Sequence, residues 1–81
     1  MMRNPVWTQL CFANRGKEYM VELDDQRRVL RVFVVVTPPT AQNPYWRKLW
    51  SAQDGKPMGT TAACAARAAL RVMAEKAEIN Y

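Results

Sequence analysis

The first third of the chain contains two segments in which apolar and polar residues alternate, and this period of two constrains the fold more than any other feature. The segments, residues 6–13 and 18–23, flank the sequence Asn-Arg-Gly-Lys at residues 14–17. Alternation is typical of a strand with one buried face, and the intervening residues are common in turns. The pattern predicts a β-hairpin. The next run, residues 29–37, is dense in β-branched side chains and predicts a third, largely buried strand.

The register of these strands can be predicted, because a slip of one residue moves every side chain to the other face. One register, with four-residue loops closing both hairpins, gathers the apolar side chains on one face. The expected rows are Phe12, Tyr19 and Val34, then Leu10, Val21 and Val32, then Thr8, Leu23 and Leu30.

The second face of this predicted sheet is mixed. It places Glu22 between Gln9 and Arg31, an opposite-charge arrangement that stabilises paired strands. Several apolar side chains lie on the same face, namely Trp7, Cys11, Met20, Val29, Phe33 and Val35. We therefore expect residues 38–58 or a partner to cover it.

Residues 37–44 are predicted to form a loop, because they contain three prolines. The segment that follows is ambiguous. Asn43 as N-cap, Pro44 in the first turn and Gly55 past the end would bracket a short helix. The aromatic composition of residues 45–52 and the Asp-Gly dipeptide at 54–55 instead favour a strand, which is the interpretation we prefer.

Residues 60–78 form the clearest predicted helix, with Thr60 or Thr61 as N-cap and no interior glycine or proline. Its expected buried face consists of Ala62, Ala65, Ala66, Ala69, Met73 and Ala77. Residues 1–81 are thus predicted to form a single α+β domain. Its antiparallel meander of three to four strands carries a carboxy-terminal alanine-rich helix on one face.

The chain lacks histidine, which excludes catalysis by Ser-His or Cys-His pairs and histidine-metal sites. The two cysteines, Cys11 and Cys64, are expected to be free, because the predicted register points them apart. We expect no enzymatic activity, no metal and no cofactor, although a reactive thiol at Cys64 is the open alternative. The longest apolar run, Val32 to Val36, is too short to cross a membrane. With no secretory signal visible, a cytoplasmic protein is expected.

The formal net charge of +5 favours an acidic partner, and we expect this to be nucleic acid or a nucleoprotein. Aromatic residues beside cations in the segment 45–50 suit base stacking and phosphate contact. The candidate binding residues are Arg15, Lys17, Tyr45, Trp46, Arg47, Lys48, Lys56 and Thr60.

The alternative hypothesis is a protein-binding module, such as an inhibitor or adaptor of the kind that phages encode, with an acidic protein as partner. Its anchor would be the apolar part of the second face or the tryptophan segment at residues 45–50. Self-association through the same face, giving a homodimer, is a variant. The residues concerned are Trp7, Met20, Phe33, Val35 and Trp50.

Overall fold

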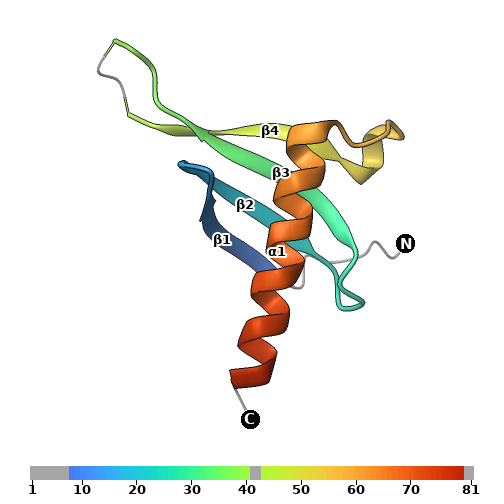
Figure 1. Cartoon of the computed structure of the whole chain (residues 1–81). Coiled ribbons are helices and arrows are strands. Elements are labelled where there is room, and N and C mark those ends of the chain that lie inside the picture. The colour runs from blue at the N-terminus through green and yellow to red at the C-terminus, as the bar shows by residue number, and fades with distance from the viewer. Residues whose placement is uncertain (1–7, 41–42, 80–81) are drawn as a thin grey trace.

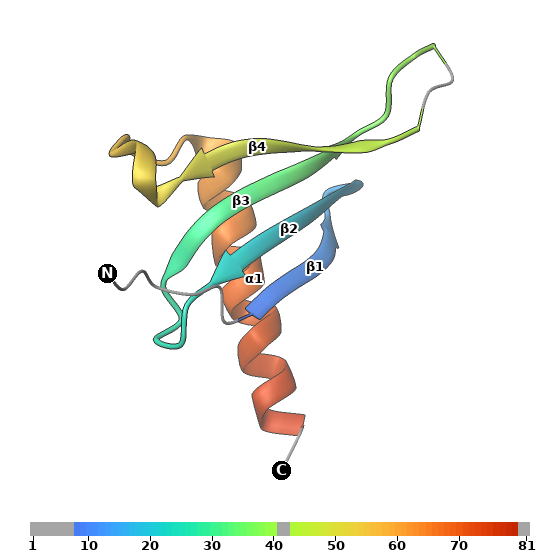
Figure 2. The ribbon, with the colours of Figure 1, turned by 180° about the vertical axis from the view of Figure 1, so that it is seen from behind.

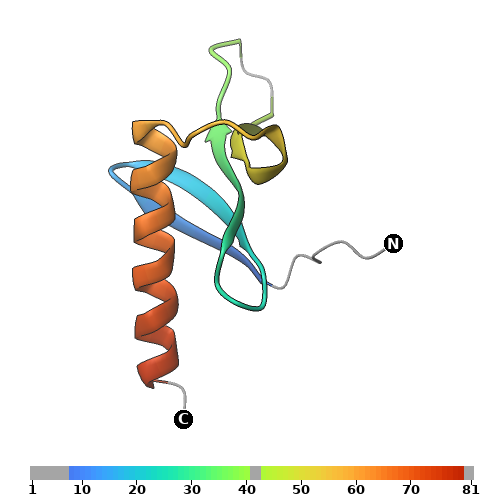
Figure 3. The ribbon, with the colours of Figure 1, turned by 90° about the vertical axis from the view of Figure 1, so that its right-hand side faces the viewer.

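The computed structural model describes residues 8–40 and 43–79, with side chains up to residue 75. Four strands form an antiparallel meander in chain order, and one helix packs on one face of it, which confirms the predicted α+β fold (Figure 1). Seen from the side, the helix forms a layer of its own (Figure 3). The elements are β1 (Thr8–Asn14), β2 (Lys17–Leu23), β3 (Val29–Val36), β4 (Tyr45–Ser51), the 3-10 turn η1 (Ala52–Asp54) and α1 (Thr60–Ile79).

The hydrophobic core lies between α1 and the face of the sheet that it covers, which we call the helix face. Alanines make up the helix side of this core, so that the helix axis can lie close to the strands. The buried core residues are Leu10, Tyr19, Val21, Leu23, Val32 and Val34 from the sheet and Ala62, Ala65 and Ala69 from the helix. Ala66 is also buried and Met73 packs against the core, as predicted, whereas Ala77 lies beyond the described side chains.

The register between the first three strands confirms most of the predicted rows. Phe12 pairs with Tyr19, and Glu22 lies between Gln9 and Arg31. One predicted pair is wrong, because Leu23 lies opposite Val29 rather than Leu30. The register shifts there because the turn between β2 and β3 has five residues, 24–28, instead of four.

Asp24 organises this five-residue turn. Its carboxylate accepts hydrogen bonds from the backbone N–H of Arg28 (2.8 Å) and of Gln26 (2.9 Å), and the Arg28 Nε donates to the second oxygen at 2.9 Å. The backbone N–H of Arg28 is the largest cause of a lowered pKa for Asp24; the N–H of Gln26 and the Arg28 guanidinium add to it against the opposing effect of burial.

We expect Asp24→Asn to lower the stability of the protein at neutral pH. Because the pKa of Asp24 is lowered in the folded state, its contribution is complete above the ordinary aspartate value of 3.8 and is lost as the pH falls through the folded value. Thermal melts of both proteins from pH 7 down to pH 2 would therefore converge at the acid end. A stability difference that stays constant over this range would contradict the assignment.

β4 is a strand, as preferred over a helix, and it pairs with β3 along the edge of the sheet. Residues 45–51 therefore extend the sheet instead of covering its second face. A bulge interrupts the pairing: Phe33 lies opposite Lys48, but Val32 lies opposite Trp50, which leaves Leu49 as the extra residue. The described residues of the predicted loop, 37–40 and 43–44, are in neither strand nor helix.

The bulge turns Trp50 to the helix face, where its ring packs against the core and its indole N–H donates to the carbonyl oxygen of Lys56 at 2.8 Å. After η1 the chain turns through Gly55, whose φ of 68° is in the left-handed region, and enters α1. The carbonyl of Gly59 accepts the first helical hydrogen bond, from Ala63 at 2.9 Å. Gly59 is thus the N-cap residue, and the expectation of Thr60 or Thr61 in that place is wrong.

Candidate nucleic-acid interface

The residues at the start of β4 alternate between the two faces of the sheet. Tyr45 lies opposite Val36 and Arg47 opposite Val34, so both belong to the helix face. Trp46 and Lys48 point to the other face, which carries no helix and which we call the open face (Figure 2). The aromatic and basic cluster of the sequence is therefore divided into two surfaces.

The first surface, the basic end, consists of Arg15, Lys17, Tyr45 and Arg47. Lys17 opens β2, and Tyr45 and Arg47 open β4, so these residues lie at the same end of the antiparallel sheet. The helix crosses the sheet farther along and leaves this end uncovered (Figure 1). All four residues are exposed, and Tyr45 is 53% exposed.

Arg15 and Lys17 of the basic end belong to the hairpin of β1 and β2. Arg15 and Gly16 form a two-residue turn with φ angles of 55° and 79°, the left-handed combination that matches the twist of a hairpin. The rings of Phe12 and Tyr19 stack behind this turn, with centroids 6.0 Å apart and planes inclined by 29°. The hairpin therefore presents its cations from a packed support.

Charge on the helix face has a single sign near the basic end. The helix-face positions of the four strands, all of which are described, contain no carboxylate. Their only charged side chains are those of Lys17 and Arg47, both positive. Neither cation forms an ion pair among the described residues, whereas Arg28, Arg31 and Lys48 do. Both remain available to an anionic ligand.

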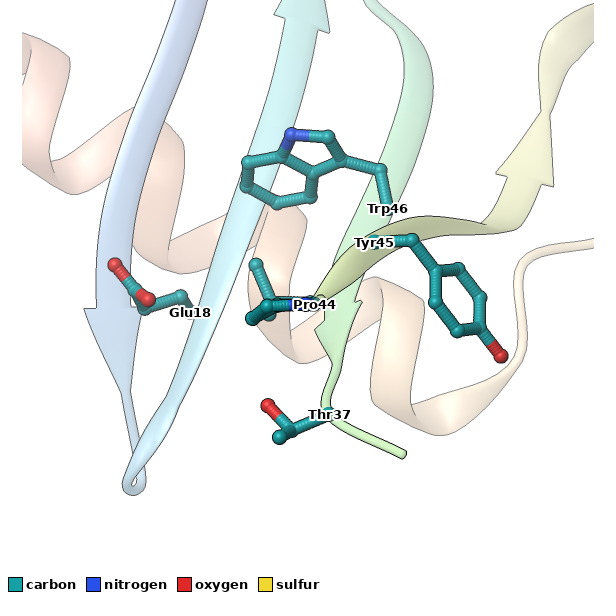
Figure 4. A pocket seen from close by; sticks show the side chains of 6 residues that line it. Glu18, Thr37, Pro44, Tyr45 and Trp46 are labelled. Carbon is teal, nitrogen blue, oxygen red and sulfur yellow. The ribbon is translucent and has the colours of Figure 1, made fainter. Parts of the chain in front are cut away.

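The second surface lies on the open face around Trp46, which is 43% exposed. Trp46 extends over β3 toward β2, while Tyr45 points the opposite way (Figure 4). A shallow hollow of about 230 Å³ lies beside the indole; its lining residues are Glu18, Val35, Thr37, Pro44, Tyr45 and Trp46. Lys48, on the same face, is 3.8 Å from the carboxylate of Asp54, and both side chains are half exposed.

Sequence reasoning missed the contribution of Glu18, Thr37 and Pro44 to this hollow. Glu18 could have been found, because the predicted pairing of Tyr19 with Val34 places Glu18, the residue before Tyr19, opposite Val35. Thr37 and Pro44 could not, because they belong to a proline-rich segment that has no periodic pattern.

The remaining predicted binding residues lie elsewhere. Lys56 and Thr60 follow the far end of β4, and a seven-residue strand is about 20 Å long, so neither belongs to the basic end. Trp50 is on the helix face, and Trp7 lies outside the described residues. The open face does carry Met20, Phe33 and Val35, all half-buried.

The described part of the chain was also searched for metal-binding groups, reactive cysteines and membrane-spanning helices. Within it, no three histidine, cysteine, aspartate or glutamate side chains are grouped to hold a metal ion. Cys11 is exposed, Cys64 is half-buried, and both are free. No helix among the described residues is long and apolar enough to span a membrane. No family model, curated protein or solved structure matches this chain.

Proposed function

We propose that this protein binds nucleic acid through the basic end. The observation that carries the proposal is that Lys17, Tyr45 and Arg47 are exposed on the helix face, where no strand position carries a carboxylate. Cations beside an exposed aromatic ring are the combination with which proteins hold a phosphate backbone and stack a base. The net charge of +5 adds long-range attraction for a polyanion.

We propose a separate role for each residue of the basic end. Arg15, Lys17 and Arg47 contact phosphates, and the half-exposed ring of Tyr45 stacks on a base. Stacking requires a base that is not already within a duplex, so single strands are preferred over double strands. β2 and β4 are two strand spacings apart, roughly 10 Å, so Lys17 and Arg47 contact different phosphates.

A salt titration of binding to fluorescently labelled, mixed-sequence single strands of DNA and RNA tests this proposal. Three phosphate contacts predict a log-log slope of about −2 for a single strand. Lys17→Ala combined with Arg47→Ala should weaken binding strongly and bring the slope to about −0.7, since only Arg15 remains. The matched control, Lys56→Ala with Arg67→Ala, removes the same charge from exposed positions outside the basic end and should leave the slope near −2.

Two outcomes would overturn the proposal: absence of salt-dependent binding, or equal losses in both double variants.

A protein partner is the second candidate, favoured by the exposed Trp46 and the half-buried Phe33 and Val35 on the open face. It would be indicated if no nucleic acid binds and a nuclease-treated pull-down retains one stoichiometric protein that Trp46→Ser releases and Tyr45→Ser does not.

A further inference from the structure

Within residues 8–40 and 43–79, β1 is an edge strand without the features that usually keep edge strands from pairing. Edge strands expose a row of unpaired backbone N–H and C=O groups, and charges, prolines or bulges commonly prevent other chains from adding to them. β1, with the sequence Thr-Gln-Leu-Cys-Phe-Ala-Asn, has no charged residue and no proline, and its pairing with β2 has no bulge. The opposite edge, β4, has Pro44 before it, two adjacent cations and the bulge at Leu49.

The helix is longer than the sheet that it covers. Twenty residues of α1 span about 30 Å, whereas four strands are about 15 Å across from first to last axis. Val72 and Met73 still pack against the core, and the last turns of α1 project past the β1 edge (Figures 1 and 2). All buried helix side chains among those described lie between Ala62 and Ala69, and the next residue, Leu70, is 37% exposed.

We infer that β1 pairs antiparallel with β1 of a second copy of this chain, forming one continuous eight-stranded sheet. The pairing that uses all seven residues is centred on the middle one, so Cys11 lies opposite the partner's Cys11. Leu10 then lies opposite the partner's Phe12 on the helix face, and Gln9 lies opposite the partner's Ala13 on the open face. This register contains no charge, it joins apolar Leu10 to apolar Phe12 on the helix face, and it leaves no free β1 edge.

The same arrangement also gives the projecting end of each α1 a surface on which to pack, namely β1 of the partner. Antiparallel pairing of identical strands in one sheet has its two-fold axis perpendicular to that sheet, so both helices lie on the same face. The last turns of α1, beyond Met73, then lie over the partner's β1, and Leu70 and the half-buried Phe12 beside the new contact lose exposure to water. Pairing and helix overhang thus point to the same partner, and the inference does not depend on the proposed nucleic-acid function.

The molar mass of the full chain in solution, measured by sedimentation equilibrium under reducing conditions, tests the inference. The unaltered protein and Cys11→Ser should both be dimers. Cys11→Lys and Cys11→Glu each place like charges directly opposite each other, and each should raise the dimer dissociation constant by about fivefold or more. An equimolar mixture of these two variants should restore the dimer, which shows that both are folded.

A short bis-maleimide provides a second measurement. It should link two chains of the unaltered protein and of Cys64→Ser, but not of Cys11→Ser. A monomer at all concentrations would overturn the inference, as would a dimer that both charged variants leave unchanged or a cross-link that persists without Cys11.

Discussion

Replacing Ala65 by leucine is expected to destabilise the fold by about 1–3 kcal/mol, because a larger side chain at this fully buried position overpacks the contact between α1 and the sheet. Ala65 is fully buried, and it packs with Ala62 and Ala69 on a sheet surface that includes the fully buried Val21 and Val32. Three added carbon atoms would force the helix away from the strands along its whole length. The alanines therefore act as spacers that set the distance between the layers.

The matched control for this variant is Ala74→Leu, the same substitution at an exposed position of the same helix. Alanine and leucine have similar helix propensities, so the free energy of unfolding should change by less than about 0.5 kcal/mol. Urea denaturation followed by circular dichroism at one fixed protein concentration measures both variants. Equal losses of stability would show that helix propensity, and not the close approach of α1, limits the size of residue 65.

The helix and the first hairpin could be predicted because their patterns leave one solution. A one-residue slip between β1 and β2 would place Leu10 and Val21 on opposite faces, so that only one of them could be buried, and burial therefore determines the register. The helix has no interior glycine or proline, and its alanines follow one face. In these segments the local pattern and the packing of the whole fold agree, so the helix and the hairpin could be predicted from the sequence alone.

The bulge in β4 could not be predicted in the same way. Leu49 and Trp50 are both apolar, so the local pattern does not say which of them faces the core. Contact with Val32 and the hydrogen bond from Trp50 to Lys56 decide this, and both depend on how η1 and α1 follow the strand. Without the bulge, Trp50 would lie opposite Arg31 on the open face.

The candidate site was predicted in composition but not in arrangement. Residues 45–48 form one cluster along the sequence, but successive side chains of a strand point to opposite faces. Lys17 shares its face with Arg47 and not with Lys48, a result that follows only when the register of all four strands is known. The basic end is consequently smaller than the predicted site and has a single sign of charge.

A second large effect on stability is expected at Glu22, a buried charge on the open face. Its side chain is 5% exposed, forms an ion pair with the Nε of Arg31 and accepts a hydrogen bond from the Nε2 of Gln9 at 2.8 Å. Loss of one partner from a buried pair leaves an uncompensated charge, which costs about 3–5 kcal/mol. Arg31 is 43% exposed, so water can replace part of its contribution.

We therefore expect Arg31→Met to destabilise the protein by about 2–3 kcal/mol, somewhat less than a fully buried pair would. Lys48→Met is the matched control, because its partner Asp54 is itself 48% exposed and such surface pairs contribute about 0–1 kcal/mol. Urea denaturation of both variants at pH 7 gives the comparison. If the two losses are equal, burial of Glu22 does not determine the strength of its pair.

The double variant Glu22→Met with Arg31→Met separates the cost of an isolated charge from the value of the pair. Removing both partners leaves no charge to be stranded, and methionine side chains match the half-apolar surface formed by Met20 and Phe33. The double variant should thus regain most of the stability that Arg31→Met loses, with a coupling energy of about 1–3 kcal/mol in the double-mutant cycle. Additive losses would mean that Glu22 and Arg31 act independently. In that case the hydrogen bond from Gln9 and local hydration, rather than Arg31, would satisfy the Glu22 carboxylate.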